Sequence, residues 1–404
     1  MTNKLGIYVH IPFCRSKCDY CDFYSCATTG DHLSNEQGAM DAYLKALLHH
    51  FKETAPFARS HQVDSIYIGG GTPSYFGGKR LRELLGQLMR RYHVSRDAEI
   101  TVECNPDTVN ERLMKSLVKA GVNRISLGVQ SAVESELRAV GRIHNFEQVK
   151  EAIRLAKSAK LNNISLDIIY GLPGQTLESL TYTLDAVIAL DPAHISCYGL
   201  KVEDGTQLAR RVAEGETLPD DDTQADMYLF AVNKLAQGGY RQYEISNFSR
   251  PGTQSRHNLK YWMSRDYLGF GPGAHSYFDG RRYSIIKDTA AYIHAMTNGG
   301  ELLDENEVLD QRSKACEYLM LRLRTVRGIE EWEYRREFFM NFDPIERKLF
   351  ELEVDGYVVR DDRRWHLTPK GFLLSNALIG LLLDVQEEQK LENLIPRLRR
   401  EEEK

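Results

Sequence analysis

Three cysteines lie close together near the start of the sequence, directly after an apolar run. Cys14, Cys18 and Cys21 are separated by three and by two residues, and they follow the apolar residues 6–13. Three thiolates can bind three irons of a [4Fe–4S] cluster, which leaves the fourth iron open for a substrate. Soft sulfur ligands of this kind select iron–sulfur clusters or zinc. The spacing therefore predicts an open iron–sulfur site.

Two alternative explanations of these cysteines compete with the cluster. A closed zinc site needs four protein ligands, so Cys26 or His10 would have to complete it. Disulfides are disfavoured because the chain has 7 cysteines, an odd number, and no visible secretory segment. The spacing favours the iron–sulfur site over zinc and leaves zinc open.

A run of three glycines ends the second apolar run of the sequence. Gly69, Gly70 and Gly71 stand between the apolar residues 65–68 and Thr72. Glycine lets the backbone approach a ligand closely and tolerates positive φ. An ordinary tight turn would use the same residues. Because the previous apolar run leads into the cysteine loop, the two features together predict a cofactor cradle.

Single polar residues stand at the ends of later apolar runs or inside them. Glu103 and Gln130 end two of these runs, and Asp167 lies within a third. A carboxylate among apolar residues costs free energy unless it is hydrogen-bonded, so Asp167 is a candidate ligand group. The alternative for all three residues is a buried structural hydrogen bond. Arg142 either binds an anion such as a carboxylate or lies on the surface.

Up to about residue 250, strand-like runs alternate with amphipathic helix-like stretches. The six strand-like runs cover residues 7–11, 65–69, 99–104, 124–130, 163–169 and 194–200. The alternation predicts parallel βα units, and six units fit an open or partial (β/α)6 barrel of the α/β class. Active sites of such folds gather at the carboxyl ends of the strands, so the cysteine loop and the polar residues should face one cavity.

Composition narrows the class of protein. Hydrophobic residues make up 42% and charged residues 27% of the chain, as is typical of a soluble globular protein. The net charge of -5 gives no electrostatic footprint for nucleic acid. The start of the sequence does not resemble a signal peptide, and the apolar stretch 377–383 is too short to span a bilayer. We therefore expect a cytoplasmic protein with no nucleic-acid partner.

The composition and the residue pattern change in the later part of the chain. A glycine-rich segment covers residues 267–276, and the acidic residues 301–306 predict a linker. Helix-like stretches and a hairpin at residues 357–367 then predict a winged-helix-like module. We therefore expect three parts: a barrel at 1–250, a connecting segment at 251–305 and a smaller C-terminal domain at 306–404.

Taken together, these residues resemble the radical S-adenosylmethionine (SAM) superfamily, and the stretch from Tyr8 to Cys14 resembles its coproporphyrinogen III dehydrogenase branch. The resemblance extends over nearly the whole chain, including the C-terminal module. It implies a radical SAM partial barrel in which Cys14, Cys18 and Cys21 hold the cluster. It also implies that the cofactor SAM contacts a further set of residues: Tyr8, Gly70, Gly71, Thr72, Glu103, Gln130, Arg142 and Asp167.

Two departures point to one group within this branch. The dehydrogenase carries another cysteine two residues after its third cluster cysteine, where this sequence has Phe23. His257, Tyr261 and Trp262 match the His-Asn-x-x-Tyr-Trp signature of the related heme chaperones. That resemblance implies that His257 is an axial ligand of heme iron and that the two aromatic side chains lie against the porphyrin. The residues without the family would favour a structural loop with a satisfied histidine.

The resemblance thus implies a heme chaperone that carries the cluster and SAM, binds heme and passes it to apo-hemoproteins such as respiratory enzymes. It further implies a homodimer and transient contact with membrane-bound acceptors. The alternative is an active radical SAM enzyme that acts on a porphyrin, by anaerobic coproporphyrinogen III decarboxylation or by heme modification. The residues leave open whether SAM is cleaved, and we assign no catalytic residue.

Overall fold

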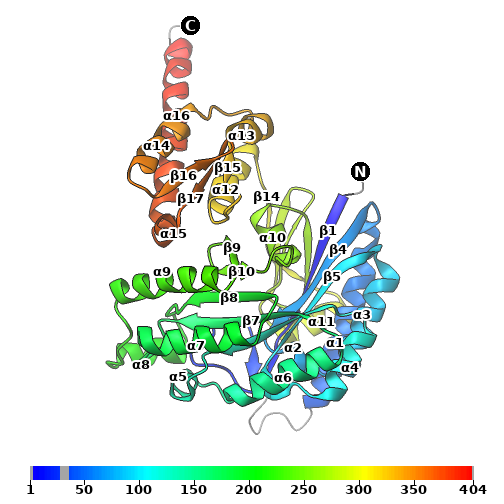
Figure 1. The fold of residues 1–404 in the computed structure, drawn as a ribbon. Coiled ribbons are helices and arrows are strands. Elements are labelled where there is room, and N and C mark those ends of the chain that lie inside the picture. The colour runs from blue at the N-terminus through cyan, green and yellow to red at the C-terminus, as the bar shows by residue number, and fades with distance from the viewer. Residues whose placement is uncertain (1–2, 28–35, 403–404) are drawn as a thin grey trace. The chain divides into compact units, whose positions relative to one another are not determined.

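The computed structural model describes residues 3–27 and 36–402, which form two compact units (Figure 1). Unit 1 comprises Met1–Arg241, Ser246–Lys260 and Arg265–Val308, and unit 2 comprises Gln242–Ile245, Tyr261–Ser264 and Leu309–Lys404. Residues 1–2 and 403–404, at the outer ends of the predicted first and last domains, lie outside the described residues. The predicted domain boundaries at 250 and 305 stay predictions.

Six parallel strands form the centre of unit 1. Their order in the sheet follows the sequence: β1 (Asn3–Ile11), β4 (His61–Gly70), β5 (Val94–Cys104), β6 (Arg124–Gln130), β7 (Asn163–Tyr170) and β8 (His194–Gly199). Such an order arises when a helical crossover joins each strand to its neighbour. The predicted partial (β/α)6 barrel is therefore confirmed.

Helices connect these strands (Figure 1). The helices up to residue 237 are α1 (Glu36–Thr54), α2 (Pro73–Phe76), α3 (Gly78–Arg91), α4 (Glu111–Lys119), α5 (Glu134–Ala139), α6 (Phe146–Ser158), α7 (Leu177–Ala189), α8 (Gln207–Ala213) and α9 (Asp221–Gln237), with 3-10 turns at Ala55–Ala58 and Pro106–Thr108. α1 packs against α3, α3 against α4 and α4 against α6, and α7 packs against α9. Polar residues define their starts: Asn145 and Gln148 form a capping box at α6, and Thr176 and Ser179 form one at α7. These boxes satisfy the backbone donors that a first helical turn leaves free.

Alternation along each strand separates the core from the interior cavity. On β6, Ile125 and Leu127 are fully buried, whereas Arg124 and Ser126 line the cavity. Successive side chains of a strand point to opposite faces, so every second residue of the strand faces the interior. The apolar set therefore packs against the helices, and the polar set is available to a ligand.

Further strands extend the sheet at both ends. β11 (Tyr267–Phe270) pairs parallel with β1, and β12 (His275–Phe278), β13 (Arg281–Ile285) and β14 (Leu303–Val308) continue antiparallel. At the other end β10 (Asn247–Ser249) pairs antiparallel with β8. The prediction of a linker at 301–306 is wrong, because most of this stretch belongs to β14. Its acidic side chains are exposed on an outer strand, where charge opposes pairing with other chains.

Unit 2 is mainly helical and contains a small sheet in the order β15-β17-β16. Its elements include most of β9 (Arg241–Glu244), α12 (Gln311–Arg322), β15 (Ile329–Glu330), α13 (Glu331–Phe338), α14 (Asp343–Val354), β16 (Val358–Asp361), β17 (Arg364–Leu367), α15 (Pro369–Leu373) and α16 (Ser375–Glu402). The predicted hairpin is confirmed as β16 and β17. Trp365 of this hairpin is fully buried and packs edge to face on Phe350 at 4.9 Å.

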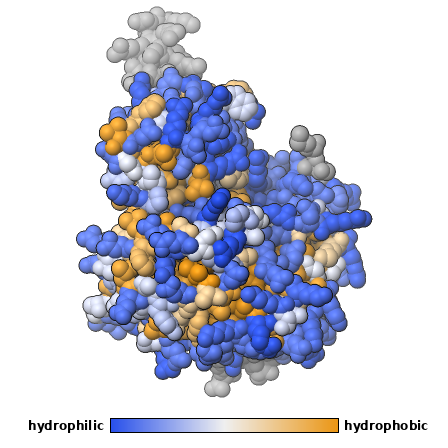
Figure 2. Space-filling model, in the orientation of Figure 1, coloured by the Kyte–Doolittle hydropathy of each residue, from blue (hydrophilic) through white to orange (hydrophobic). Residues whose placement is uncertain are grey.

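Among the described residues, no helix combines the length and the apolar character that a membrane-spanning helix requires. Figure 2 shows hydrophilic residues over most of the face in view, with apolar residues in smaller areas between them.

Candidate cofactor pocket

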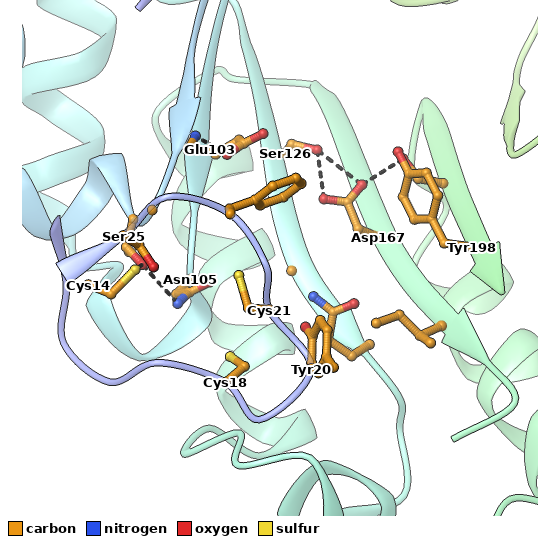
Figure 3. A pocket seen from close by; sticks show the side chains of 18 of the residues that line it. Cys14, Cys18, Tyr20, Cys21, Ser25, Glu103, Asn105, Ser126, Asp167 and Tyr198 are labelled. Atoms are coloured by element: carbon orange, nitrogen blue, oxygen red, sulfur yellow. Dashed lines mark hydrogen bonds between the residues drawn. The ribbon is translucent and has the colours of Figure 1, made fainter. Parts of the chain in front are cut away.

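The carboxyl ends of the parallel strands of unit 1 surround a cavity of about 360 Å³. Its lining combines the cysteine loop, the glycine run and polar side chains from β5 to β8 (Figure 3). Ligand sites of parallel sheets form at this edge, outside the carboxyl ends of the strands. The structure therefore brings the three cysteines and most of the predicted polar residues to one place.

The three cysteines line this cavity from β2 and the loop that follows. Cys14 ends β2 (Phe13–Cys14), which pairs with β3 (Cys26–Ala27), and Cys18 and Cys21 follow in the loop (Figure 3). Within the part of the chain that the structure describes, no three Cys, His, Asp or Glu side chains converge closely enough to hold a metal ion. The three thiols therefore share the cavity without lying at metal-binding separation.

The surroundings of the thiols suit metal-bound thiolates. Burial raises the pKa of Cys14 and raises that of Cys21 to about 11, because a free thiolate would lose its hydration there. Thr72 Oγ1 donates to Cys14 Sγ at 3.5 Å, and Arg142 Nη1 donates to Cys18 Sγ at 3.3 Å. A coordinated metal deprotonates such thiols, and hydrogen bonds to cluster sulfurs tune the cluster. The donor set therefore fits the cluster that the sequence predicts.

The zinc alternative requires a fourth ligand, for which His10 and Cys26 were the candidates. His10 already uses both ring nitrogens: Nε2 bonds to the carbonyl oxygen of Tyr24 at 2.8 Å, and Nδ1 bonds to the hydroxyl of Tyr8 at 3.0 Å. Cys26 is exposed. Completion of a zinc site by His10 would break two hydrogen bonds of a buried ring.

The middle of the cysteine loop is fixed to unit 1 at Asp19. Its backbone N–H donates to the carbonyl of Val140 at 3.1 Å, and its own carbonyl accepts from the N–H of Leu208 at 2.8 Å. Its carboxylate pairs with Arg211 Nη1 at 2.7 Å. These contacts hold the loop between the second and third cysteines against α8 and the end of α5.

The glycine run passes directly beside the segment from His10 to Cys14, here called the cysteine strand. A Cβ on Gly70, whose φ is 110°, would lie 2.5 Å from the His10 ring, and a Cβ on Gly71 would lie 2.9 Å from Cys14 Sγ. The N–H of Gly71 donates to the carbonyl of Ile11 at 2.8 Å. Any side chain here would displace the cysteine strand, so close backbone approach explains the glycines.

Two buried carboxylates reach the cavity. Glu103 accepts hydrogen bonds from Tyr67 Oη at 2.7 Å and from the N–H of Gly70 at 3.1 Å, and burial raises its pKa to about 7. Asp167 accepts from Ser126 Oγ at 3.0 Å and from Ser196 Oγ at 2.7 Å, and burial also raises its pKa (Figure 3). Both carboxylates are hydrogen-bonded by the protein and still line the cavity, so the structural role does not exclude the predicted ligand role.

Three other predicted residues lie at different depths. Gln130 lines the cavity with a φ of 65°, and Arg142 lines it with only 9% exposure, so Arg142 is not a surface arginine. Arg142 Nη2 donates to Asn105 Oδ1 at 3.1 Å and to the carbonyl of Gly128 at 2.7 Å. The Tyr8 ring stacks at 6.3 Å on Tyr67, which lines the cavity, so Tyr8 supports the wall from behind.

Sequence reasoning missed several residues of the lining: Tyr67, Asn105, Arg124, Ser126, Ser196 and Tyr198. The signal for Arg124 was available, because the argument that singled out Asp167 applies equally to a cation at the start of an apolar strand. The period of two would have identified Ser126, which stands two residues after Arg124 on β6. Neither signal singles out Tyr198, since tyrosine is common in strands.

The predicted heme motif begins α10 (Arg256–Trp262), and His257 is fully buried in it. Its Nδ1 bonds to Ser65 Oγ at 3.0 Å, and its ring stacks on Tyr67 at 5.4 Å with an interplanar angle of 25°. Burial lowers its pKa to about 3. His257 belongs to unit 1, whereas the half-buried Tyr261 and Trp262 belong to unit 2. The assignment of these three residues to heme stays a prediction.

Comparisons with known proteins agree with this geometry. The model of the radical SAM superfamily matches residues 8–187, and that of the HemN C-terminal domain matches residues 309–374. The heme chaperone HemW of Escherichia coli is 36% identical over 94% of this chain and 98% of its own length. That of Lactococcus lactis is 35% identical over 93% of this chain and 96% of its own length.

A solved structure shares the fold of both units. Coproporphyrinogen III oxidase (HemN) from Escherichia coli, described as a radical SAM enzyme, matches with a TM-score of 0.81. The match covers 94% of this chain and 90% of that chain at 24% sequence identity. At this identity the likeness establishes the fold, a radical SAM barrel with a smaller C-terminal domain, as predicted.

Proposed function

This chain belongs to the HemW family of heme chaperones within the radical SAM superfamily, and on that premise we propose that it binds heme and delivers it to apo-hemoproteins. The predicted resemblance is thereby confirmed. The observation that carries the proposal is the match to proteins named heme chaperones over nearly their whole length. Membership of the radical SAM family also implies a [4Fe–4S] cluster and SAM.

We assign the cluster and SAM to the pocket of unit 1. Cys14, Cys18 and Cys21 would hold the cluster, which when bound supplies one-electron chemistry to SAM. The residues proposed for SAM are Tyr8, Gly70, Gly71, Thr72, Glu103, Gln130, Arg142 and Asp167. The ionised carboxylate of Glu103 would bind a positively charged group of SAM. Asp167, which already accepts from Ser126, Ser165 and Ser196, has the acceptor oxygens that ribose hydroxyls need.

We assign heme to the motif formed by His257, Tyr261 and Trp262. The imidazole of His257 would ligate the iron, and the two aromatic rings would lie against the porphyrin. Because His257 is fully buried and bonded to Ser65, ligation requires its side chain to leave its present position. Apo-hemoproteins such as respiratory enzymes, some of them membrane-bound, would receive the heme in the cytoplasm. Formation of a homodimer is part of the same proposal.

A hemin titration tests this function. Hemin is added to anaerobically reconstituted wild-type protein and to His257→Ala, and the Soret band is followed. We expect a saturable shift near one heme per chain that is weakened in the variant. The variant His275→Ala is the control, because His275 is an exposed histidine outside the motif. Binding of hemin no tighter than to an unrelated protein of similar size would contradict the proposal.

The second candidate is an active radical SAM enzyme acting on a porphyrin. The pocket favours this class because all the residues proposed for the cluster and SAM except Tyr8 line it together. Phe23 opposes the coproporphyrinogen reaction, since it stands 61% exposed where the dehydrogenase has another cysteine. Anaerobic incubation with coproporphyrinogen III, SAM and a reductant separates the two candidates. We expect no protoporphyrinogen above the level of a Cys18→Ala control.

A further inference from the structure

The first residues of α10 lie against β1, β4 and β5, at the end of the barrel opposite the cysteine loop. Gly6, on β1, makes room for it: a Cβ there would lie 2.8 Å from Lys260 Cδ and 3.2 Å from His257 Cε1. Ser65, on β4, is paired in register with Gly6 and bonds to His257. The first residues of the motif therefore fill the interior of the barrel at this end. We call this end, around Gly6, Ser65 and His257, the barrel floor.

Charged residues of the floor fix this helix in place. The backbone N–H groups of Arg256 and His257 both donate to the carboxylate of Glu99, each at 3.1 Å. Lys260 Nζ pairs with Asp64 Oδ1 at 2.6 Å, and only 7% and 19% of these side chains are exposed. Hydrogen bonds to a buried carboxylate are strong and geometrically specific, so the position of His257 is defined by β4 and β5.

A short chain of contacts leads from His257 to the cofactor pocket. The imidazole stacks on Tyr67, whose hydroxyl donates to Glu103 Oε1 at 2.7 Å. The other oxygen of Glu103 accepts the N–H of Gly70 at 3.1 Å. Tyr67, Gly70 and Glu103 all line the pocket. His257 thus supports, from below, the tyrosine that orients a pocket carboxylate.

We propose that His257 is a positioning residue of the cofactor pocket: through Tyr67 it holds Glu103 in place, so that ligation of heme by His257 and binding of SAM oppose one another. The second half of this proposal rests on the proposed function. When the imidazole leaves the floor, Tyr67 loses the ring on which it stacks, and its hydrogen bond to Glu103 weakens. By linkage, each ligand then lowers the affinity for the other by the same factor.

A double-variant cycle tests the positioning role of His257. The affinity for radiolabelled SAM is measured by anaerobic equilibrium dialysis for wild type, His257→Ala, Tyr67→Phe and the double variant, at equal iron and sulfide content. We expect about a three- to tenfold loss in each single variant, the loss that one weakened hydrogen bond produces. The double variant should bind no more weakly than Tyr67→Phe alone, because both substitutions break the same chain of contacts.

Controls separate positioning from general damage to the fold. His50 is a matched buried histidine, bonded to the hydroxyl of Tyr292 at 3.1 Å and not part of the pocket lining, so His50→Ala should leave the affinity for SAM unchanged. His257→Gln, which lacks the ring, should bind SAM as weakly as His257→Ala and replaces it if that variant does not fold. Additive losses, or an affinity for SAM within twofold of wild type in Tyr67→Phe and both His257 variants, would overturn the proposal.

The pH profile of SAM binding gives a second readout. The groups that face Glu103 are Tyr8, Tyr67, Arg124 and Asp167, and of these only Tyr67 donates a hydrogen bond to it. Loss of that hydrogen bond in Tyr67→Phe, or its weakening in His257→Ala, destabilises the ionised carboxylate, so the midpoint of the profile should move upward in both variants. A purely structural role of His257 would leave the midpoint where it is.

The opposition between heme binding and SAM binding is tested separately. The affinity for SAM is measured with and without saturating hemin in wild type and in Tyr67→Phe. We expect hemin to weaken SAM binding in wild type and to have little effect in the variant, where the connection is already broken. If hemin does not bind at all, the proposed function fails while the double-variant cycle still decides the positioning role. Hemin binding that leaves the affinity for SAM unchanged would overturn the coupling alone.

Discussion

Glu103 shows how its place in the fold changes the chemistry of one residue. Its pKa is raised from 4.5 to about 7, above all by burial and also by the neighbouring Asp167. Hydrogen bonds from Tyr67 and Gly70 and the charge of Arg124 oppose the rise. Glu103 therefore exchanges its proton near neutral pH, which an exposed glutamate does not do.

At the residue scale we expect the affinity for SAM to decrease as the pH is lowered. Ionised Glu103 attracts the positive groups of SAM, and the neutral form, which predominates below its pKa of about 7, does not. Below that pKa the dissociation constant should rise by up to about tenfold per pH unit. Equilibrium dialysis at several pH values measures the effect. Glu103→Gln should bind weakly at every pH, and a persisting slope would assign the titration to another group.

At the element scale, the end of β4 has no space for a side chain. We expect Gly71→Ala to lower the iron content per chain and to destabilise the protein by about 1–3 kcal/mol, because its Cβ would lie 2.9 Å from Cys14 Sγ and from the carbonyl oxygens of Ile11 and Phe13. Urea unfolding and iron analysis measure the two effects.

Gly86 provides the matched control for that substitution. It lies inside α3, and a Cβ there would meet nothing within 4 Å. Gly86→Ala should therefore raise the stability by about 0.5–1 kcal/mol, since alanine loses less conformational entropy than glycine in a helix. Equal iron content in the two glycine variants would show that the close approach of Gly71 does not matter to the cluster.

The strands differ in how clearly the sequence announces them. In residues 124–130 every second side chain is apolar because helices cover that face of the strand, and the predicted range coincides with the observed β6. β11, β12 and β14 were not predicted, because a glycine-rich stretch and an acidic stretch lack the apolar pattern of a covered strand. Their strand character comes from pairing with the barrel edge, which is a long-range contact.

At the scale of the whole molecule, buried neutral histidines make stability depend on acid. Burial lowers the pKa of His10 and His144 to about 4 and that of His50 and His257 to about 3, from an ordinary value of 6.5. In the unfolded chain the ordinary value returns, so below about pH 6.5 the unfolded state binds more protons than the folded state. The stability is therefore complete above that pH and is lost as the pH falls.

We expect the free energy of unfolding to drop steeply between about pH 6.5 and pH 4, by up to about 1.4 kcal/mol per pH unit for each such histidine. Urea unfolding followed by circular dichroism at several pH values measures the slope. His50→Gln should reduce it, whereas His93→Gln, at an exposed position, should not. An unchanged slope in His50→Gln would show that the buried histidines do not cause the acid sensitivity.

The sequence by itself determined the class of chemistry and the order of the main elements. The spacing of Cys14, Cys18 and Cys21 and the alternation of apolar runs are local properties, and local patterns are legible without a structure. The same holds for Glu103 and Asp167, since a carboxylate in an apolar run is conspicuous wherever the run goes.

Only the tertiary structure decided which residues meet. In the structure His257, which the sequence marks as a candidate heme ligand, is fully buried and stacks on Tyr67. Arg142 lies at the thiol of Cys18, 124 positions away in the chain. Such contacts depend on strand register and on how a helix packs against the strands, and both are set by packing between distant segments. No single stretch of sequence carries that information.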